Sequence, residues 1–197
     1  MLHFIHALTR NHPQVSSFLF GTRLTNISRQ MQHRDVDGAV QSVSHLVDDW
    51  SGGTRISASL EIFNQDWSRL VMGHGAITLL ITDGLDRNPD DALGKHMERL
   101  HKSTAALLWL NPLLRFDGFA PKSHSVRTMI QHVDHFLPIH SLQAMTDLTA
   151  ILAKMQTRRD TKLAEWQAAT RRVSLAADLV PAHVKEPAYT QEKGHTA

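Results

Sequence analysis

Two short loops contain the residues of this chain whose types and positions suit a binding site. Thr54 follows two glycines in the loop W-S-G-G-T-R at residues 50–55, and Asp83 follows an apolar stretch in I-T-D-G at residues 81–84. In folds built on a parallel sheet, such loops meet at the carboxyl edge of the sheet, where ligands bind. A threonine hydroxyl and an aspartate carboxylate suit a hard cation such as Mg²⁺, which prefers oxygen ligands and keeps several waters. The two loops therefore predict a metal site with Thr54 and Asp83 as ligands.

Both residues also have an ordinary structural interpretation. Thr54 is typical of a helix N-cap, where its hydroxyl accepts a hydrogen bond from a backbone amide. Asp83 and Gly84 form a pair that is common in turns. No other loop of the sequence offers the further hydroxyls and carboxylate that a complete Mg²⁺ site needs. The residues thus predict half of a metal site, so that Mg²⁺ binding by this chain alone is in doubt.

Three residues near these loops are candidates for contact with a partner protein. Arg55 suits an acidic ligand, although a surface ion pair explains it equally well. Asp86 either faces the site or belongs to a solvated loop. Asn111 ends an apolar strand before Pro112, where it shapes the rim of the site or takes part in a turn set by the proline. None of these residues is predicted to be catalytic.

Several histidines are close in sequence, but their spacing argues against a shared metal site. His132 and His135 fall on opposite faces of a predicted strand, and His140 follows that strand. His3 and His6 are one helical turn apart, and we expect them at the surface or at an interface.

The composition excludes several classes of function. The chain has 197 residues, of which 42% are hydrophobic, and it contains no cysteine. The lack of cysteine excludes thiol catalysis, zinc–thiolate sites and disulfides, and it favours a reducing cytoplasm. No apolar stretch approaches the roughly 20 residues that a membrane-spanning helix needs, and the apolar residues at the N-terminus are too few for a signal peptide. A formal charge of +2 is too small to predict nucleic-acid binding by itself.

The hydrophobic pattern predicts short strands that alternate with helices over residues 1–152. We expect helices at residues 2–10, 35–47, 54–72, 90–101 and 141–152, and strands at 15–20, 22–27, 76–81, 105–110 and 133–137. The first two strands flank Gly21 and are expected to form a hairpin. Strands that alternate with helices form right-handed βαβ units with a parallel sheet. The pattern therefore predicts an α/β fold.

The residues after this domain differ in composition. Residues 153–179 are predicted to form a basic helical extension, in which the segment 154–172 carries six lysines or arginines against Asp160 and Glu165. A solvated helix and a surface that docks on an acidic partner both fit this pattern. Residues 180–197 are polar and contain Pro181 and Pro187, which predicts a disordered tail.

Five motifs, in order along the chain, resemble the CoxE-like family of von Willebrand factor A (VWA) domains. They are F-G-T-R-L at residues 20–24, D-W-S-G-G-T-R-I at 49–56, I-T-D-G-L-D-R at 81–87, W-L-N-P-L at 109–113 and H-V-D-H-F-L-P at 132–138. The resemblance covers about residues 1–152. It implies a Rossmann-like, doubly wound, mostly parallel sheet with a metal-ion-dependent adhesion site at its top. It also implies an accessory factor that works with a MoxR-type AAA+ ATPase, best known from the maturation of aerobic carbon monoxide dehydrogenase.

The resemblance assigns roles to the two loops. By position, Thr54 resembles the direct threonine ligand of the family's metal site, and Asp83 resembles the aspartate that acts through water. The third part of that site, a D-x-S-x-S loop after the first strand, has no counterpart here. Because that loop precedes the helix that residues 1–10 resemble, we expect an N-terminally truncated VWA domain that lacks its first central strand, or a strand donated by a partner. The strands at 15–20 and 76–81 would then lack their common neighbour.

Three functions remain open at this point. The first is a protein-interaction module in which Mg²⁺ bridges Thr54, Asp83 and a carboxylate of the partner. The second is a metal-independent scaffold, because half of the metal site is absent. The third is an Mg²⁺-dependent hydrolase that uses Asp83, although the chain lacks the G-x-x-x-x-G-K-[ST] and G-x-S-x-G motifs of nucleotide-binding and hydrolytic sites.

Overall fold

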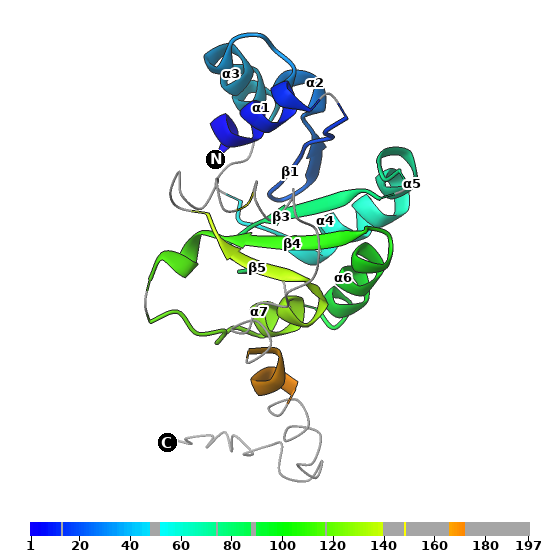
Figure 1. Cartoon of the computed structure of the whole chain (residues 1–197), viewed down its shortest axis with the longest axis vertical. Coiled ribbons are helices and arrows are strands. Elements are labelled where there is room, and N and C mark those ends of the chain that lie inside the picture. Colours follow the sequence, from blue (N-terminus) through cyan, green and yellow to red (C-terminus); the bar gives the residue numbers. More distant parts are fainter. Residues whose placement is uncertain are drawn as a thin grey trace, which may run out of the picture.

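The chain folds into strands that alternate with helices (Figure 1). The computed structural model describes residues 1–12, 14–47, 52–73, 75–87, 90–116, 118–139, 148 and 166–171. The strands are β1 (Phe18–Phe20), β2 (Leu24–Asn26), β3 (Ile77–Ile81), β4 (Ala106–Asn111) and β5 (His135–Pro138). The α-helices are α1 (Leu2–Asn11), α2 (Ser28–Met31), α3 (Val36–Leu46), α4 (Ile56–Ile62), α5 (Ser68–Val71), α6 (Leu93–Lys102) and α7 (His124–Met129). A π-helical turn, η1 (Phe63–Trp67), joins α4 to α5, and two 3₁₀-helices are η2 (Pro112–Arg115) and η3 (Ile130–His132).

Strands β3, β4 and β5 form a parallel sheet with β4 in the middle. Leu79 of β3 lies opposite Leu108 of β4, which lies opposite His135 of β5. All six residues of β4 are buried, as expected for a strand that is covered on both faces. The hairpin of β1 and β2 is antiparallel and separate, with Leu19 opposite Thr25. This arrangement confirms the predicted α/β fold with a parallel sheet.

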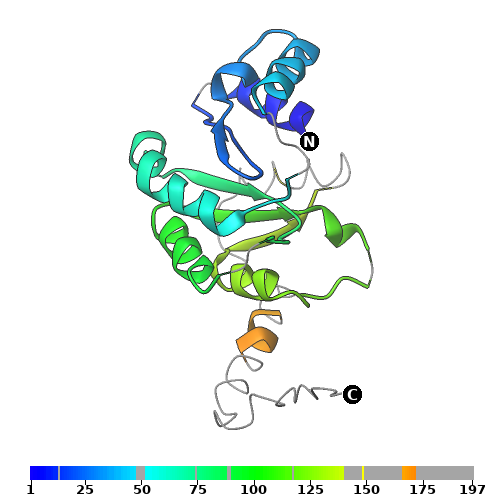
Figure 2. The same cartoon turned by 180° about the vertical axis from the view of Figure 1, so that it is seen from behind.

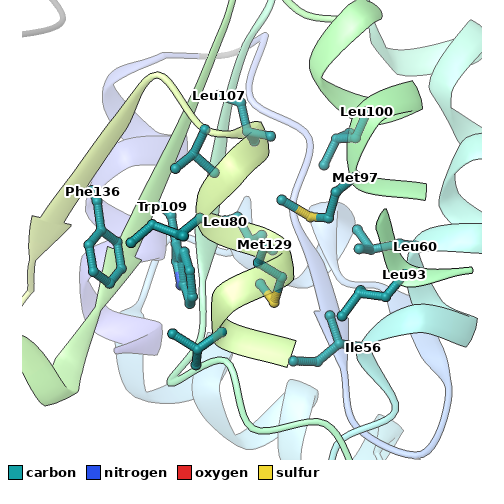
Figure 3. Packing of buried hydrophobic residues seen from close by; sticks show 13 residues of the cluster. Ile56, Leu60, Leu80, Leu93, Met97, Leu100, Leu107, Trp109, Met129 and Phe136 are labelled. Atoms are coloured by element: carbon teal, nitrogen blue, oxygen red, sulfur yellow. The ribbon is translucent and has the colours of Figure 1, made fainter. Parts of the chain in front are cut away.

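Helices α4, α6 and α7 cover one face of the sheet, as Figure 2 shows from behind. Their apolar residues recur at three- and four-residue spacing, which places them on one side of each helix. The resulting cluster combines Leu80, Leu107, Trp109 and Phe136 of the strands with Ile56, Leu60, Leu93, Met97, Leu100, Val126, Met129 and Ile130 of the helical segments. Trp109 lies between Phe136 and Leu80 in this packing (Figure 3), and its ring centroid is 4.5 Å from that of Phe136.

The opposite face of the sheet is buried in a smaller cluster. Leu108 and Leu110 of β4 pack there with Phe4 of α1, Ile139 and Leu148. Because successive residues of a strand point to opposite faces, β4 contributes to both clusters in alternation. This two-sided burial explains why the strand is a continuous apolar run rather than an alternation of apolar and polar residues.

Aromatic contacts anchor the hairpin to the helical segment that follows the Thr54 loop. Phe18 of β1 lies edge-on to Phe63 and Trp67, with ring centroids 5.2 and 5.1 Å apart. Both partners belong to η1. The π-helical turn also buries Asn64, whose Nδ2 donates a hydrogen bond to the carbonyl oxygen of His96 in α6 at 2.9 Å. The hairpin, α5 and α6 therefore meet around this one turn.

Most of the predicted elements are present where the structure describes the chain. The helices expected at 2–10, 35–47, 54–72 and 90–101 correspond to α1, α3, α4 to α5, and α6. All five predicted strands are found; β4 keeps the predicted length but is shifted by one residue, and the other four are shorter. The sequence missed α2, α7, η2 and η3, which have six residues or fewer and are too short to show an apolar period.

Parts of the C-terminal predictions lie outside the described residues. This holds for the helix expected at 141–152, apart from Leu148, and for the tail at 180–197. Within the basic extension expected at 153–179, residues 166–171 are described and are helical. Of the helices in the described ranges, none combines the length and apolar character required to cross a membrane.

Strand β3 forms one edge of the described sheet. It pairs with β4 on one side, and none of the described strands pairs with its other side. Strand β1 pairs with β2 and belongs to a different sheet, so the described strands do not connect the hairpin to β3. The absence of a first central strand between them stays a prediction.

His132, at the end of η3, is half-buried near α6, and its environment makes stability depend on pH. Burial lowers the pKa of its imidazole below the ordinary value of 6.5; Glu98 opposes this shift, and the charge of His101 adds to it. The unfolded chain therefore takes up a proton at this position at a higher pH than the folded protein does. By linkage, the free energy of unfolding falls as the pH drops below 6.5 toward the pKa of the folded state.

Replacing His132 should weaken this pH dependence. We expect the wild-type protein to lose more stability than His132→Gln between about pH 7.5 and about pH 5.5, because only the wild type has this group to protonate on unfolding. Urea unfolding at the two pH values measures the difference. The comparison at the higher pH reports the change in packing alone, and an equal loss in both proteins would contradict the prediction.

Candidate functional site

The loop after β3 is shaped first by hydrogen bonds within itself. The hydroxyl of Thr82 accepts a hydrogen bond from the N–H of Gly84 at 3.1 Å. The carboxylate of Asp83 accepts one from the N–H of Leu85 at 3.0 Å. Bonds from a side chain to a backbone group two residues on are the usual reason why threonine and aspartate occur in turns. The turn interpretation of Asp83 and Gly84 is therefore confirmed, and it leaves the Asp83 side chain half-buried.

Three buried side chains then fix the backbone of this loop. Trp109 Nε1 donates to the carbonyl oxygen of Thr82 at 2.9 Å, and Asn111 Nδ2 donates to that of Asp83 at 3.1 Å. Ser125 Oγ donates to the carbonyl oxygen of Gly84 at 2.7 Å. Three consecutive carbonyl groups thus each accept a bond from a side chain of β4 or α7. We name these three donors the carbonyl clamp.

Gly84 is required by the same packing. Its φ is 81°, a conformation that residues with a side chain rarely adopt. A Cβ atom at this position would lie 2.6 Å from Trp109 Cζ2 and 2.8 Å from Val126 Cγ2. The closeness of the backbone to the indole ring is what allows Trp109 to reach the carbonyl of Thr82.

A second group of bonds joins the Thr54 loop to the Asp83 loop. The N–H of Arg87 donates to the carbonyl oxygen of Thr54 at 2.9 Å, and the Arg87 guanidinium donates to that of Gly52. Asp86 Oδ2 accepts a bond from the N–H of Ser57, in the first turn of α4, at 2.9 Å. This carboxylate satisfies a helix N-terminal amide that otherwise has no partner in the helix.

Ser57 and Asp90 extend this connection to α6. The hydroxyl of Ser57 donates to Asp90 Oδ1 at 2.6 Å, and the same oxygen accepts bonds from the N–H groups of Ala92 and Leu93 at 3.1 and 3.0 Å. Asp90 therefore links the start of α6 to the start of α4. The bonds of Asp86, Arg87 and Asp90 together form what we call the loop clasp.

The structure places the expected partner-contact residues differently. Arg55 is exposed, and its N–H donates to the carbonyl oxygen of Gly21 in the hairpin at 2.9 Å. Asp86 belongs to the loop clasp and is half-buried. Asn111 is fully buried, and its Oδ1 accepts a bond from the N–H of Leu113 at 2.8 Å. Both ends of the Asn111 amide are thus used inside the protein, where they shape the Asp83 loop and the start of η2. Contact of Asn111 with a partner stays a prediction.

Thr54 and Asp83 are held on joined loops, but they face different depressions. Thr54 lines a cavity of about 180 Å³ beside the hairpin, together with Phe20 and Arg23. Asp83 lines an open groove of about 350 Å³ between its own loop and the segment that runs from η2 to α7. Asp83 directly follows β3 at the carboxyl edge of the sheet, and Thr54 is joined to this loop through the N–H of Arg87. The sequence does not show the direction in which each of them faces.

These positions do not fit a complete Mg²⁺ site. Thr54 and Asp83 supply two oxygen donors of the right kind, whereas the carboxylate of Asp86 is occupied by Ser57. Over the ranges that the structure describes, no group of three histidine, cysteine, aspartate or glutamate side chains could hold a metal ion. Mg²⁺ binding at Thr54 and Asp83 stays a prediction.

The histidines take structural positions. His101 Nε2 lies 3.1 Å from Asp134 Oδ1, and Asp134 Oδ2 accepts a bond from the N–H of Leu107. His6 was expected at the surface or an interface, but it is buried, and its Nε2 bonds with the carbonyl oxygen of His33 at 2.8 Å. His3 is exposed, as expected. His140 lies outside the described residues.

Sequence reasoning missed most of the residues that position the site. Trp109 belongs to the motif W-L-N-P-L, but the sequence assigned it no role in the site. It also assigned no role in the site to Ser57, Asp90 or Ser125. The placement of Trp109 just before a strand end was a usable signal, because the carboxyl edge of the sheet was already the expected site. Ser125 had no such signal, since it lies 41 residues from its partner Gly84.

A family model described as "VWA domain containing CoxE-like protein" matches residues 1–145. The chain belongs to this family. The mixed fold with a parallel sheet agrees with a VWA domain, and the family is one of accessory and interaction modules. No curated protein and no solved structure matches the chain. The matched region of this CoxE-like protein includes the carbonyl clamp and the loop clasp.

Two glycines with similar backbone angles test the role of the carbonyl clamp. Gly75 has a φ of 79° with open space around its Cβ position, whereas Gly84 is crowded by Trp109. Alanine at a positive φ costs about 1–2 kcal/mol, and overpacking a core typically adds about 1–3 kcal/mol. We expect Gly75→Ala to show the first cost alone and Gly84→Ala to show both, as measured by urea unfolding. Equal losses in the two variants would contradict this account of Gly84.

Proposed function

We propose that this CoxE-like protein is a non-catalytic interaction module that assists a MoxR-type AAA+ ATPase in the maturation of a metalloenzyme. Family membership supports the general role. The ATPase partner and a client of the aerobic carbon monoxide dehydrogenase type follow from the resemblance of the five motifs. In this role, the domain binds the client enzyme and brings it into contact with the AAA+ ATPase.

The observation that carries the proposal is the rigid display of the Asp83 loop beside an open groove. Three buried side chains bind successive carbonyl groups of this loop, and they leave Asp83 and Leu85 facing the groove. A loop that is ordered before binding loses little conformational entropy when a partner docks. A hydrolase would instead need a nucleophile and a base in contact, and the sequence offers no motif for either.

The donor set favours a contact that does not depend on a metal. In that form of the proposal, Asp83 contributes through its bond to the N–H of Leu85, which sets the shape of the loop. In the alternative form, Mg²⁺ bridges Thr54, Asp83 and a partner carboxylate. The two forms predict different results for the same substitutions.

Two variants of Asp83 separate these forms. Asn keeps an oxygen that can accept the Leu85 hydrogen bond, whereas Ala removes it. We expect Asp83→Ala to weaken binding to the MoxR-type ATPase from the same cells by about tenfold, which is of the order of losing one hydrogen bond to a charged group. We expect Asp83→Asn to change the affinity for the ATPase by less than about threefold, as measured by calorimetry with the full chain.

The exposed Asp66 of η1 provides the control, because Asp66→Asn removes a similar charge far from the loop in the sequence. Failure of the wild-type protein to bind the ATPase would overturn the proposed partner. Phosphatase or ATPase activity that disappears with Asp83→Asn would support the hydrolase instead.

Removal of divalent cations gives an independent prediction. Because the described residues do not assemble a complete Mg²⁺ site, we expect the affinity for the ATPase, measured without nucleotide, to be the same in EDTA and in excess Mg²⁺. Omitting nucleotide keeps the Mg²⁺ requirement of the ATPase itself out of the comparison. A loss in EDTA that is restored by Mg²⁺ and absent in Asp83→Asn would establish the metal-bridged form.

A further inference from the structure

The groove beside Asp83 has a largely apolar lining. Its apolar lining consists of Leu85, Leu113, Phe119, Ala120 and Val126. Leu85 keeps 52% of its surface exposed where it lines this groove. The groove has a volume of about 350 Å³, which is enough for one or two large side chains.

The walls of the groove are held in place from behind. Phe119 packs against Phe136 and Trp166, with ring centroids 6.0 and 5.6 Å apart. Val126 is buried in the large hydrophobic cluster, and the carbonyl clamp fixes the loop that carries Leu85. The groove is therefore formed in the absence of a partner, so that an apolar side chain could enter without rearranging it.

The charges of the neighbouring segment indicate the kind of partner. Residues 112–129 contain three basic side chains, Arg115, Lys122 and Arg127, against one acidic residue, Asp117. Lys122 lines the groove and is exposed. Arg115 is exposed and lies 4.6 Å above the ring of Phe116, which is itself 52% exposed. The carboxylate of Asp83 lines the opposite wall of the groove. Because opposite charges steer partners together, acidic residues of a partner are attracted to the wall that carries Lys122 and Arg115 and are repelled by the wall of Asp83.

We propose that the groove binds a segment of a partner protein in which large apolar side chains are flanked by acidic residues. The apolar side chains lie between Leu85, Leu113 and Phe119, and the flanking carboxylates face Lys122 and Arg115. This inference rests on the proposed function, because it specifies the surface through which the interaction module recognises its partner. It requires no metal.

Short peptides test this proposal directly on the full chain. The probe is acetyl-D-E-L-F-D-E-amide, and the two reference peptides are acetyl-D-E-S-S-D-E-amide, without apolar residues, and acetyl-K-R-L-F-K-R-amide, with reversed charge. We expect the probe alone to shift the methyl NMR signals of Leu85, Leu113 and Val126 in a saturable manner. The proposal is overturned if no shifts occur, if both apolar peptides bind equally well, or if the shifts lie elsewhere.

Surface substitutions with matched controls give the second measurement. Leu85→Ser should weaken binding of the probe about tenfold, which corresponds to the loss of one buried leucine contact. Lys122→Glu should weaken it by about threefold or more through charge repulsion. The controls are Leu70→Ser on α5, where the leucine is 77% exposed, and Lys95→Glu on α6. Equal effects in variants and controls would overturn the proposal.

Two other occupants of the groove would also be revealed. If deletion of residues 180–197 shifts the groove signals without any peptide, the chain's own tail occupies the groove. If those signals change with protein concentration, a second copy occupies it. Either result overturns the proposal. If Leu85→Ser does not change binding of the ATPase, the proposed function still stands. If the probe peptide binds but the ATPase does not, the proposal that the groove binds such segments still stands.

Discussion

The geometry of the site depends on three hydrogen bonds that buried side chains donate to consecutive carbonyl groups at the end of β3. A buried carbonyl without a partner costs about 1–3 kcal/mol, so each bond of the carbonyl clamp disfavours other conformations of the loop. The loop clasp then fixes the Thr54 loop relative to the Asp83 loop, because the N–H of Arg87 donates a hydrogen bond to the carbonyl oxygen of Thr54. The two loops of the candidate site are therefore positioned by the end of one strand.

Trp109 connects this site to the core of the domain. Its ring packs against Phe136 and belongs to the larger hydrophobic cluster, while its indole N–H donates a hydrogen bond to the carbonyl oxygen of Thr82. A buried tryptophan needs a partner for its N–H, and here that partner is the loop that carries Asp83. The absence of a side chain at Gly84 lets the loop lie against the indole ring. Core packing and loop geometry consequently cannot change independently.

The sequence predicts the parts of this arrangement that depend on local pattern. Continuous apolar runs identified β3 and β4, and the loop of Asp83 follows β3 at the carboxyl edge of the sheet, as expected. The burial of a side chain at a strand end is not predicted by local pattern, because it depends on residues that are distant in sequence. Asn111 looked like a rim residue, but it is enclosed, and Ser125 reaches Gly84 from another helix. No periodicity or motif encodes such long-range bonds.

The same separation of local and long-range effects applies to recognition. Leu85 keeps its exposure because the bond from its own N–H to Asp83, together with the carbonyl clamp, holds the loop away from collapse into the groove. An apolar side chain that stays exposed on a rigid loop gains free energy mainly when a partner covers it. In the proposed complex, the affinity is therefore set by two terms: the apolar area that a partner buries and the order already present in the loop. Substitutions at Leu85 change the first term, whereas substitutions at Asp83 or Gly84 change the second.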